Sequence, residues 1–200
     1  MNERKILIVG PVGAGKTTAV KSIGNDNHIS TDVKASDVTA YQKKHTTVAM
    51  DYTPFVMDNG ERVHVYGTPG QERFNFMWDI LGKNALGIVL LLNNTRENPL
   101  HDLKFFVNTF KQYVDESQLM VGITRSDLSD SPAVHDYRSV MQSLEAFIPI
   151  YTIDARKSED VAMLINSLTC ADQAYTQSTE MITTSYDDSI DGRRQVGIKR

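Results

Sequence analysis

A run of eight residues near the start of the chain has the composition of a phosphate-binding loop. Gly10-Pro11-Val12-Gly13-Ala14-Gly15-Lys16-Thr17 has the spacing G-x-x-x-x-G-K-[ST]. The glycines let backbone N–H groups turn toward an anion, and a helix that begins near Lys16 adds its positive dipole end. We therefore expect Lys16 to reach the β- and γ-phosphates of a nucleotide and the Thr17 hydroxyl to ligate Mg²⁺.

The loop stands between an apolar, β-branched run and a helical segment, which is the context that this motif requires. The alternative is a glycine-rich turn in which the lysine occurs by chance, and the context disfavours it. The residues that we expect to contact a bound nucleotide here are Gly10, Gly13, Ala14, Gly15, Lys16, Thr17 and Thr18.

The elements that must position this loop alternate in type along the chain. Apolar runs predict six strands, over residues 5–9, 47–56, 62–66, 85–92, 119–123 and 148–153. Apolar residues at helical spacing predict helices over residues 16–23, 72–81, 100–114, 134–146 and 161–168. Asp58-Asn59-Gly60 is a hairpin turn signal. The order predicts an α/β fold of the P-loop NTPase class: a mostly parallel six-stranded sheet with one antiparallel hairpin and helices on both faces.

Composition and charge exclude several classes of protein. The chain has 200 residues, of which 40% are hydrophobic and 23% charged, as in an ordinary globular protein. Its net charge of -4 argues against a nucleic-acid partner, which needs a basic surface. The single cysteine, Cys170, can form no internal disulfide, so we expect a reducing compartment, the cytoplasm. The longest apolar run, Ala85 to Leu92, is far shorter than the roughly 20 residues that span a bilayer.

The last part of the chain differs in composition from the rest. Residues 176–200 are rich in Ser, Thr, Asp and Arg, so we expect a domain over residues 1–175 and a flexible tail over residues 176–200. The basic residues near the chain end are offset by Asp187, Asp188 and Asp191, which favours a solvated tail over a stable membrane anchor.

Four more segments occur at the ends of predicted strands. They are Thr46-Thr47-Val48-Ala49-Met50-Asp51-Tyr52, Gly67-Thr68-Pro69-Gly70-Gln71-Glu72-Arg73-Phe74, Thr124-Arg125-Ser126-Asp127 and Asp154-Ala155-Arg156. In this order they resemble the first switch, the second switch, the base-recognition box and the last base-supporting loop of a Ras-like small GTPase. The resemblance covers residues 4 to about 170 and is greatest to the prokaryotic Ras-like GTPases that partner roadblock-type proteins, the gliding-motility GTPase-like group.

This resemblance implies GTP and GDP as ligands, Mg²⁺ as cofactor, slow hydrolysis and a switch between two conformations. It implies that Thr47 closes over Mg²⁺ and the γ-phosphate, and that Gly70 offers its backbone N–H to the γ-phosphate. Gln71 would position the attacking water, and Lys16 would be the second catalytic residue. The implied partner is a roadblock-type protein or another regulatory protein.

The resemblance also implies how the base is bound. Asp127 would read N1 and N2 of guanine, and Thr124 would stand beside it in the base-recognition box. The loop of Asp154, Ala155 and Arg156 would support the base through a backbone N–H. Thr124 and Arg125 replace the asparagine and lysine usual in this box, so guanine is favoured over adenine mainly by the retained Asp127.

Two further positions depart from the family pattern near the phosphates. Gly67 stands where the second switch normally has an aspartate that holds Mg²⁺ through water. Asp51 on the neighbouring strand is either its substitute as a metal ligand or a strand-end residue held by local hydrogen bonds. Val12 would crowd the space where a partner's arginine enters in Ras, and no arginine precedes Thr47 in the first switch.

Two other functions compete with a small GTPase switch. The first is a hydrolysis-deficient protein that binds nucleotide only as a binding module, because Gly67 and Val12 alter the site. The second is a P-loop small-molecule kinase. Such kinases need an arginine-rich lid, and Arg193-Arg194 in the tail is the only adjacent arginine pair.

Overall fold

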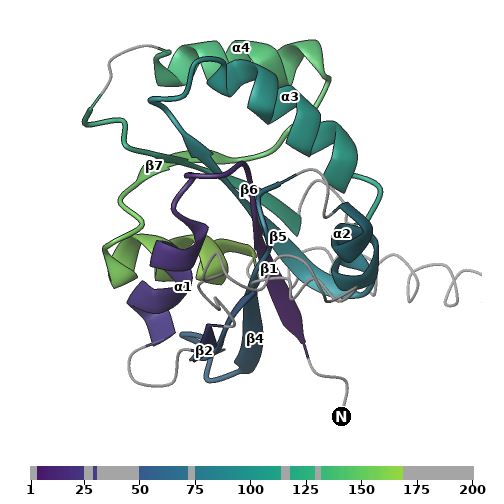
Figure 1. The fold of residues 1–200 in the computed structure, drawn as a ribbon, viewed down its shortest axis with the longest axis vertical. Helices are drawn as coiled ribbons and strands as arrows, with labels where there is room; N and C mark the ends of the chain where they lie inside the picture. The colour runs from purple at the N-terminus through teal and green to yellow at the C-terminus, as the bar shows by residue number, and fades with distance from the viewer. Residues whose placement is uncertain are drawn as a thin grey trace, which may run out of the picture.

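The computed structural model describes residues 4–24, 29–30, 50–71, 75–113, 118–128 and 132–168 (Figure 1). Thr47, residues 72–74 of the second switch, Cys170 and the tail over residues 176–200 lie outside this range. The predictions made for them are therefore not tested by the fold.

A seven-stranded sheet forms the centre of the molecule, in the order β2-β3-β4-β1-β5-β6-β7. The strands are β1 (Lys5–Val9), β2 (Ile29–Ser30), β3 (Asp51–Val56), β4 (Arg62–Gly67), β5 (Ala85–Asn93), β6 (Leu119–Thr124) and β7 (Ile150–Ile153). The pairs β1–β4, β1–β5, β5–β6 and β6–β7 are parallel, whereas β3–β4 is the predicted antiparallel hairpin. The predicted fold class is confirmed. The sequence missed only β2, whose two residues pair antiparallel with β3.

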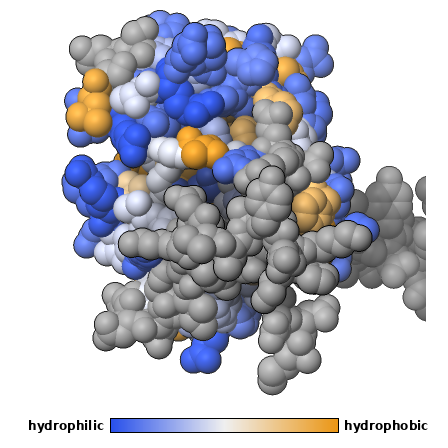
Figure 2. Space-filling model, in the orientation of Figure 1, coloured by the Kyte–Doolittle hydropathy of each residue, from blue (hydrophilic) through white to orange (hydrophobic). Residues whose placement is uncertain are grey.

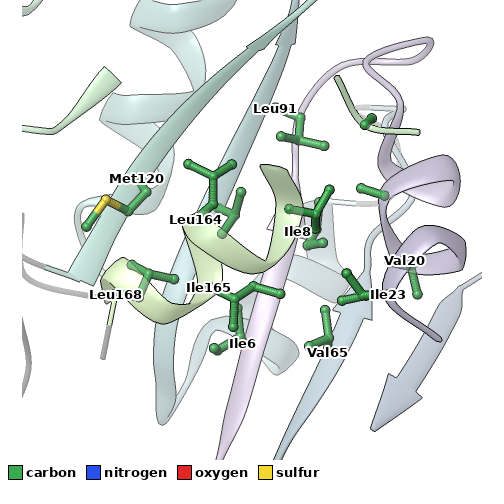
Figure 3. Close-up of a cluster of buried hydrophobic side chains, with 14 of the residues drawn as sticks. Ile6, Ile8, Val20, Ile23, Val65, Leu91, Met120, Leu164, Ile165 and Leu168 are labelled. Carbon is green, nitrogen blue, oxygen red and sulfur yellow. The ribbon is translucent and has the colours of Figure 1, made fainter. Parts of the chain in front are cut away.

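Helices cover both faces of the sheet (Figure 1). They are α1 (Lys16–Gly24), α2 (Asn75–Gly82), α3 (Pro99–Phe110), α4 (Val134–Ser143) and a last helix over residues 158–168. The first and last helices share one buried cluster with Ile6 and Ile8. The apolar side chains of the two helices point toward one another in Figure 3. The other three pack with Leu7 and Val9 of the same strand. Because neighbouring β1 side chains point to opposite faces, this one buried strand anchors both layers.

Hydrophobic side chains are concentrated in these two clusters. On the face of the molecule drawn in Figure 2, hydrophobic residues form small separate patches among hydrophilic ones. None of the helices in the described ranges is both long and apolar enough to cross a bilayer.

Several element boundaries differ from the predicted ones for identifiable reasons. The helix predicted over residues 134–146 ends at Ser143, because Glu145 adopts a left-handed backbone with φ 52° that no α-helix contains. The last strand begins at Ile150 and not at Ile148, because the intervening Pro149 has no N–H to pair. The helix predicted to reach Val114 ends at Phe110.

Strand β3 begins at Asp51, after Met50. The prediction started this strand at Thr47, which lies outside the described residues. Strands β4, β5 and β6 each extend one residue beyond the predicted end, to Gly67, Asn93 and Thr124. These extra residues pair through their backbones at the carboxyl edge of the sheet, where the site is built.

Candidate nucleotide-binding site

The phosphate loop connects β1 to α1 and borders a cleft of about 390 Å³. Because the loop follows a central parallel strand, the cleft opens at the carboxyl ends of the strands, where α/β sheets bind ligands. Its lining residues are Val12, Gly13, Gly15, Lys16, Thr17, Thr18, Asp51, Thr68, Pro69, Gly70, Gln71 and Arg125. The fold therefore brings the described parts of the phosphate loop and of both switch segments to one cavity.

Lys16 is the buried cation of this cleft. Its side chain is 8% exposed, and its Nζ donates hydrogen bonds to the carbonyl oxygens of Gly10 at 2.8 Å and Pro11 at 2.7 Å. Burial lowers the pKa of Lys16 to about 8; nearby Asp51 raises this pKa and Arg96 lowers it further. Because burial disfavours the charged ammonium, an anion bound in the cleft would stabilise it.

The start of the second switch lies directly against the phosphate loop. Thr68 donates its backbone N–H to the Ile8 carbonyl oxygen at 3.0 Å. A Cβ added to Gly70 would lie 2.5 Å from Lys16 Nζ and 2.7 Å from the Val12 nitrogen, so no other residue fits without displacing the loop. This close approach leaves Gln71 exposed at the edge of the cleft.

Asp51 is the buried carboxylate of the cleft. It is 7% exposed and pairs with Gly67 across the β3–β4 ladder. Among the described residues, no three His, Cys, Asp or Glu side chains gather as a metal cluster. Asp51 and Thr17 line the same cleft, and one carboxylate with one hydroxyl fits Mg²⁺, which takes few protein oxygens and completes its shell with phosphate oxygens and water. Asp51 also lies near enough to Lys16 to raise its pKa.

A second cleft, of about 270 Å³, adjoins the first. Its lining residues are Gly15, Thr18, Thr124, Arg125, Asp127, Leu128, Asp154, Ala155 and Arg156. Gly15, Thr18 and Arg125 line both cavities, so the two clefts join beside the phosphate loop.

Thr124 ties three segments together at this junction. Its Oγ1 lies 3.1 Å from the carbonyl oxygens of both Ala14 and Leu92, so its hydroxyl can donate to either. The side chain therefore connects the end of β6 to the phosphate loop and to β5.

Asp154 and Arg156 form an ion pair at the rim of the second cleft. The Arg156 Nη2 donates to Asp154 Oδ2 at 2.7 Å, and the Arg156 backbone N–H donates to Oδ1 at 3.0 Å. These hydrogen bonds from Arg156 lower the pKa of Asp154 to about 2. Nearby Asp127 also contributes to raising the pKa of Arg156. Asp154 therefore holds Arg156 near Asp127, the residue expected to recognise the base.

The turn after β5 contributes two residues that the sequence did not reveal. Asn93 Nδ2 donates to the Gly13 carbonyl oxygen at 3.3 Å, and Arg96 Nη1 donates to the Val12 carbonyl oxygen at 3.3 Å. No motif marks this turn. The available signal was that a long buried strand ends in a polar Asn93 at the edge where the phosphate loop lies.

The aromatic and Met residues at the end of and after the second switch divide between core and surface. Trp78 of α2 is 1% exposed and packs on Phe106 and Phe110, with ring centroids 5.5 Å and 5.3 Å away. Phe76 is 51% exposed, and Met77 is half-buried. The fourth of these residues, Phe74, lies outside the described residues.

The sequence model of the Ras family matches residues 5–175. This range includes both clefts and every described strand. The chain belongs to the Ras family. Ras-family proteins are small GTPases, which bind GTP and act as signalling switches.

Ras-related proteins of eukaryotes are similar to this chain at low identity. Ras-related protein SEC4 of Saccharomyces cerevisiae is 24% identical over 182 residues, which cover 89% of this chain and 79% of that protein. Ras-related protein Rab-27A of Homo sapiens is 21% identical over 168 residues (82% and 76%). The Intraflagellar transport protein 22 homolog of Mus musculus is 25% identical over 160 residues (72% and 82%). The family match establishes the Ras family as a whole; neither it nor these similarities single out the prokaryotic roadblock-associated group.

Proposed function

We propose that this Ras-family chain binds GTP or GDP with Mg²⁺ in the two joined clefts and hydrolyses GTP slowly. The observation that carries the proposal is the joining of the clefts. One holds buried Lys16 within the phosphate loop, and the other holds Asp127, with Gly15 and Thr18 lining both. A nucleoside triphosphate has this distribution of charge and shape.

In hydrolysis, a water oxygen attacks the γ-phosphorus while the bond to the β–γ bridging oxygen breaks. The products are GDP and inorganic phosphate, and the proton of the water ends on the phosphate. Gln71 orients the water, while Lys16 and the loop N–H groups stabilise the negative charge. Lys16 is the cation buried within the phosphate loop, and no arginine precedes Thr47 in the first switch. We therefore expect turnover near 10⁻⁴ to 10⁻³ per second, as in Ras-type enzymes without a partner's arginine.

Thr17 and Asp51 would hold the Mg²⁺, with Thr47 added from the first switch. When bound, Mg²⁺ neutralises charge on the β- and γ-phosphate oxygens. The support for Asp51 is its burial beside Lys16 and its position opposite Gly67, where the usual aspartate is missing.

Asp127 would select guanine by accepting hydrogen bonds from N1 and N2. Its support is its place in the lining of the second cleft, to which Arg125 and the Asp154–Arg156 pair also belong. Adenine presents no donor pair that matches this carboxylate, so it would leave the carboxylate poorly paired.

The switch function would operate through the two switch segments, which change partner binding when they order around the γ-phosphate. The first-switch and second-switch motifs support the prokaryotic roadblock-associated group, with a roadblock-type or other regulatory protein as partner. Exposed Phe76 on α2 is a docking residue for that partner. The single cysteine supports a location in the cytoplasm.

Nucleotide extraction from the purified protein, followed by titration of GTP, GDP and ATP with Mg²⁺, tests the function. We expect bound guanine nucleotide, with ATP binding much more weakly. Equal displacement of GTP by ATP would indicate the small-molecule kinase. GTP recovered unchanged after many hours would indicate the hydrolysis-deficient binding module.

A further inference from the structure

The turn after β5 holds the phosphate loop through two of its carbonyl oxygens. Arg96 Nη1 donates to the Val12 carbonyl oxygen at 3.3 Å, and Asn93 Nδ2 donates to the Gly13 carbonyl oxygen at 3.3 Å. These carbonyls belong to consecutive peptide groups in the middle of the loop. The two donors therefore fix the orientation of adjacent peptides that face the phosphate cleft.

The orientation of the Val12 carbonyl determines where the next N–H points. In a planar trans peptide, the C=O of Val12 and the N–H of Gly13 point in opposite directions. With its carbonyl held toward Arg96, this peptide directs the Gly13 N–H away from Arg96. Gly13 has φ +80° and no Cβ, so its own backbone restricts the rotation of this peptide less than another residue would.

Arg96 is itself held in place by α3. Its Nε donates to Asp102 Oδ2 at 2.5 Å, and its Nη2 lies 3.5 Å from Oδ1, while Nη1 reaches the Val12 carbonyl. A guanidinium can make both contacts at once because its donors form a rigid fork. The side chain of Asp102 is 16% exposed, so the pair is partly protected from water. The positive charge of Arg96 adds to the effect of burial in lowering the pKa of Lys16.

We propose that Arg96, held by Asp102, is a positioning residue for GTP hydrolysis: it holds the Val12–Gly13 peptide so that the Gly13 N–H faces the phosphate chain. This inference rests on the proposed function. An N–H that is fixed in advance stabilises charge as it develops on the oxygen that leaves the γ-phosphate. The position therefore contributes more to the rate of the chemical step than to the binding of GDP.

The test compares Arg96→Ala with Arg138→Ala, which removes an exposed arginine of α4 that lines neither cleft. Single-turnover hydrolysis, GDP affinity and melting temperature are measured for each variant. We expect R96A to hydrolyse GTP about tenfold more slowly, with GDP affinity changed less than about threefold. R138A should match the wild type in all three measurements.

Three further variants separate positioning from general stability. Arg96→Lys keeps the charge but not the fork, so its rate should stay close to that of R96A. Asp102→Ala should also slow hydrolysis, and the R96A/D102A double variant should be no slower than R96A, because both act through one contact. Phosphorus NMR of bound GDP should show a shifted β-phosphate signal in R96A and not in R138A.

The proposal is overturned if R96A hydrolyses GTP at the wild-type rate, or if R96K recovers that rate. It is also overturned if R96A weakens GDP binding as much as it slows hydrolysis. Failure of the proposed function gives a different result, because the wild-type protein would then neither bind guanine nucleotide nor release phosphate.

Discussion

Asp51 on β3 and Gly67 on β4 are direct partners across the antiparallel ladder. A Cβ added to Gly67 would lie 3.2 Å from Asp51 Cβ and 3.1 Å from Val20 Cγ2, closer than ordinary van der Waals contact. A side chain at position 67 and the present one at position 51 therefore compete for the same space. The chain carries its carboxylate on β3, and glycine on β4 leaves room for it.

This competition predicts a reciprocal exchange. Asp51→Ala should weaken Mg²⁺ binding to the nucleotide complex by about 10–100-fold, the usual effect of losing a carboxylate that supports a metal site. Combining Gly67→Asp with Asp51→Gly should recover most of that affinity, because the second switch then carries the aspartate and the Cβ of residue 51 no longer occupies the space. The measurement is the release rate of a fluorescent GDP as a function of Mg²⁺ concentration.

Gly67→Asp alone is the control for crowding. With Asp51 present, it should destabilise the protein by about 1–3 kcal/mol through overpacking and by like-charge repulsion, without tighter Mg²⁺ binding. Wild-type Mg²⁺ affinity in D51A would exclude Asp51 from the metal site and leave it as a strand-end residue.

Because the pKa of Lys16 is lowered, we expect the protein to take up a proton when the triphosphate binds. Its pKa of about 8 means that about half of the lysine is neutral at pH 8. An anionic phosphate next to the ammonium raises this pKa, so the complex holds the lysine fully protonated. Calorimetry in buffers of different ionisation enthalpy should show uptake of about half a proton at pH 8 and almost none at pH 6.5. Uptake that is equal at both pH values, or that persists in Lys16→Met, would rule out Lys16 as its source.

Lys16 should also reduce the stability of the nucleotide-free protein. Its folded-state pKa lies below the unfolded value, so the unfolded chain binds more protons between pH 8 and pH 10.5 and stability rises with pH in that window. Below pH 8 the cost of the buried charge is fully present. Lys16→Met should therefore be about 1–3 kcal/mol more stable than the wild type at pH 7, while it loses nucleotide binding.

Denaturant unfolding at several pH values measures this effect. The stability difference between Lys16→Met and the wild type should be constant below pH 8 and shrink as pH rises toward 10.5. A variant less stable than the wild type at pH 7 would mean that the hydrogen bonds to Gly10 and Pro11 outweigh the cost of burying the charge.

The succession of strands and helices along the chain and the phosphate loop could be predicted because their signals are local. The β-branched run Lys5–Val9 and the run that begins at Ala85 are buried on both faces, so their sequences are apolar without interruption. The motif between β1 and α1 then follows from spacing alone. Strand β2 has two residues, too few to show any alternation, and only its pairing with β3 reveals it.

The contacts that shape the site depend on register and on distant segments. The Asp58-Asn59-Gly60 signal predicted the hairpin, but the pairing of Asp51 with Gly67 depends on the hydrogen bond between the Met57 N–H and the Glu61 carbonyl, which sets the register. Arg96 contacts a carbonyl 84 residues earlier in the chain. Every residue has a backbone carbonyl oxygen, so a hydrogen bond to this oxygen does not require a particular side chain at position 12. The identity of Val12 therefore gave no indication that Arg96 contacts it.

The fluorescence of Trp78 should report which nucleotide is bound. It is the only tryptophan of the chain and lies in α2, soon after the second switch. Its indole Nε1 is buried and has no hydrogen-bond partner among the described residues, which leaves this end of the helix easier to displace. If GTP orders the second switch, the GDP form should show red-shifted emission and faster quenching by acrylamide than the form bound to a non-hydrolysable GTP analogue. Exchanging one nucleotide for the other should reverse both changes, and Trp78→Phe should abolish the signal while leaving the nucleotide bound. Identical spectra in the two forms would show that the packing of Trp78 on Phe106 and Phe110 does not follow the nucleotide.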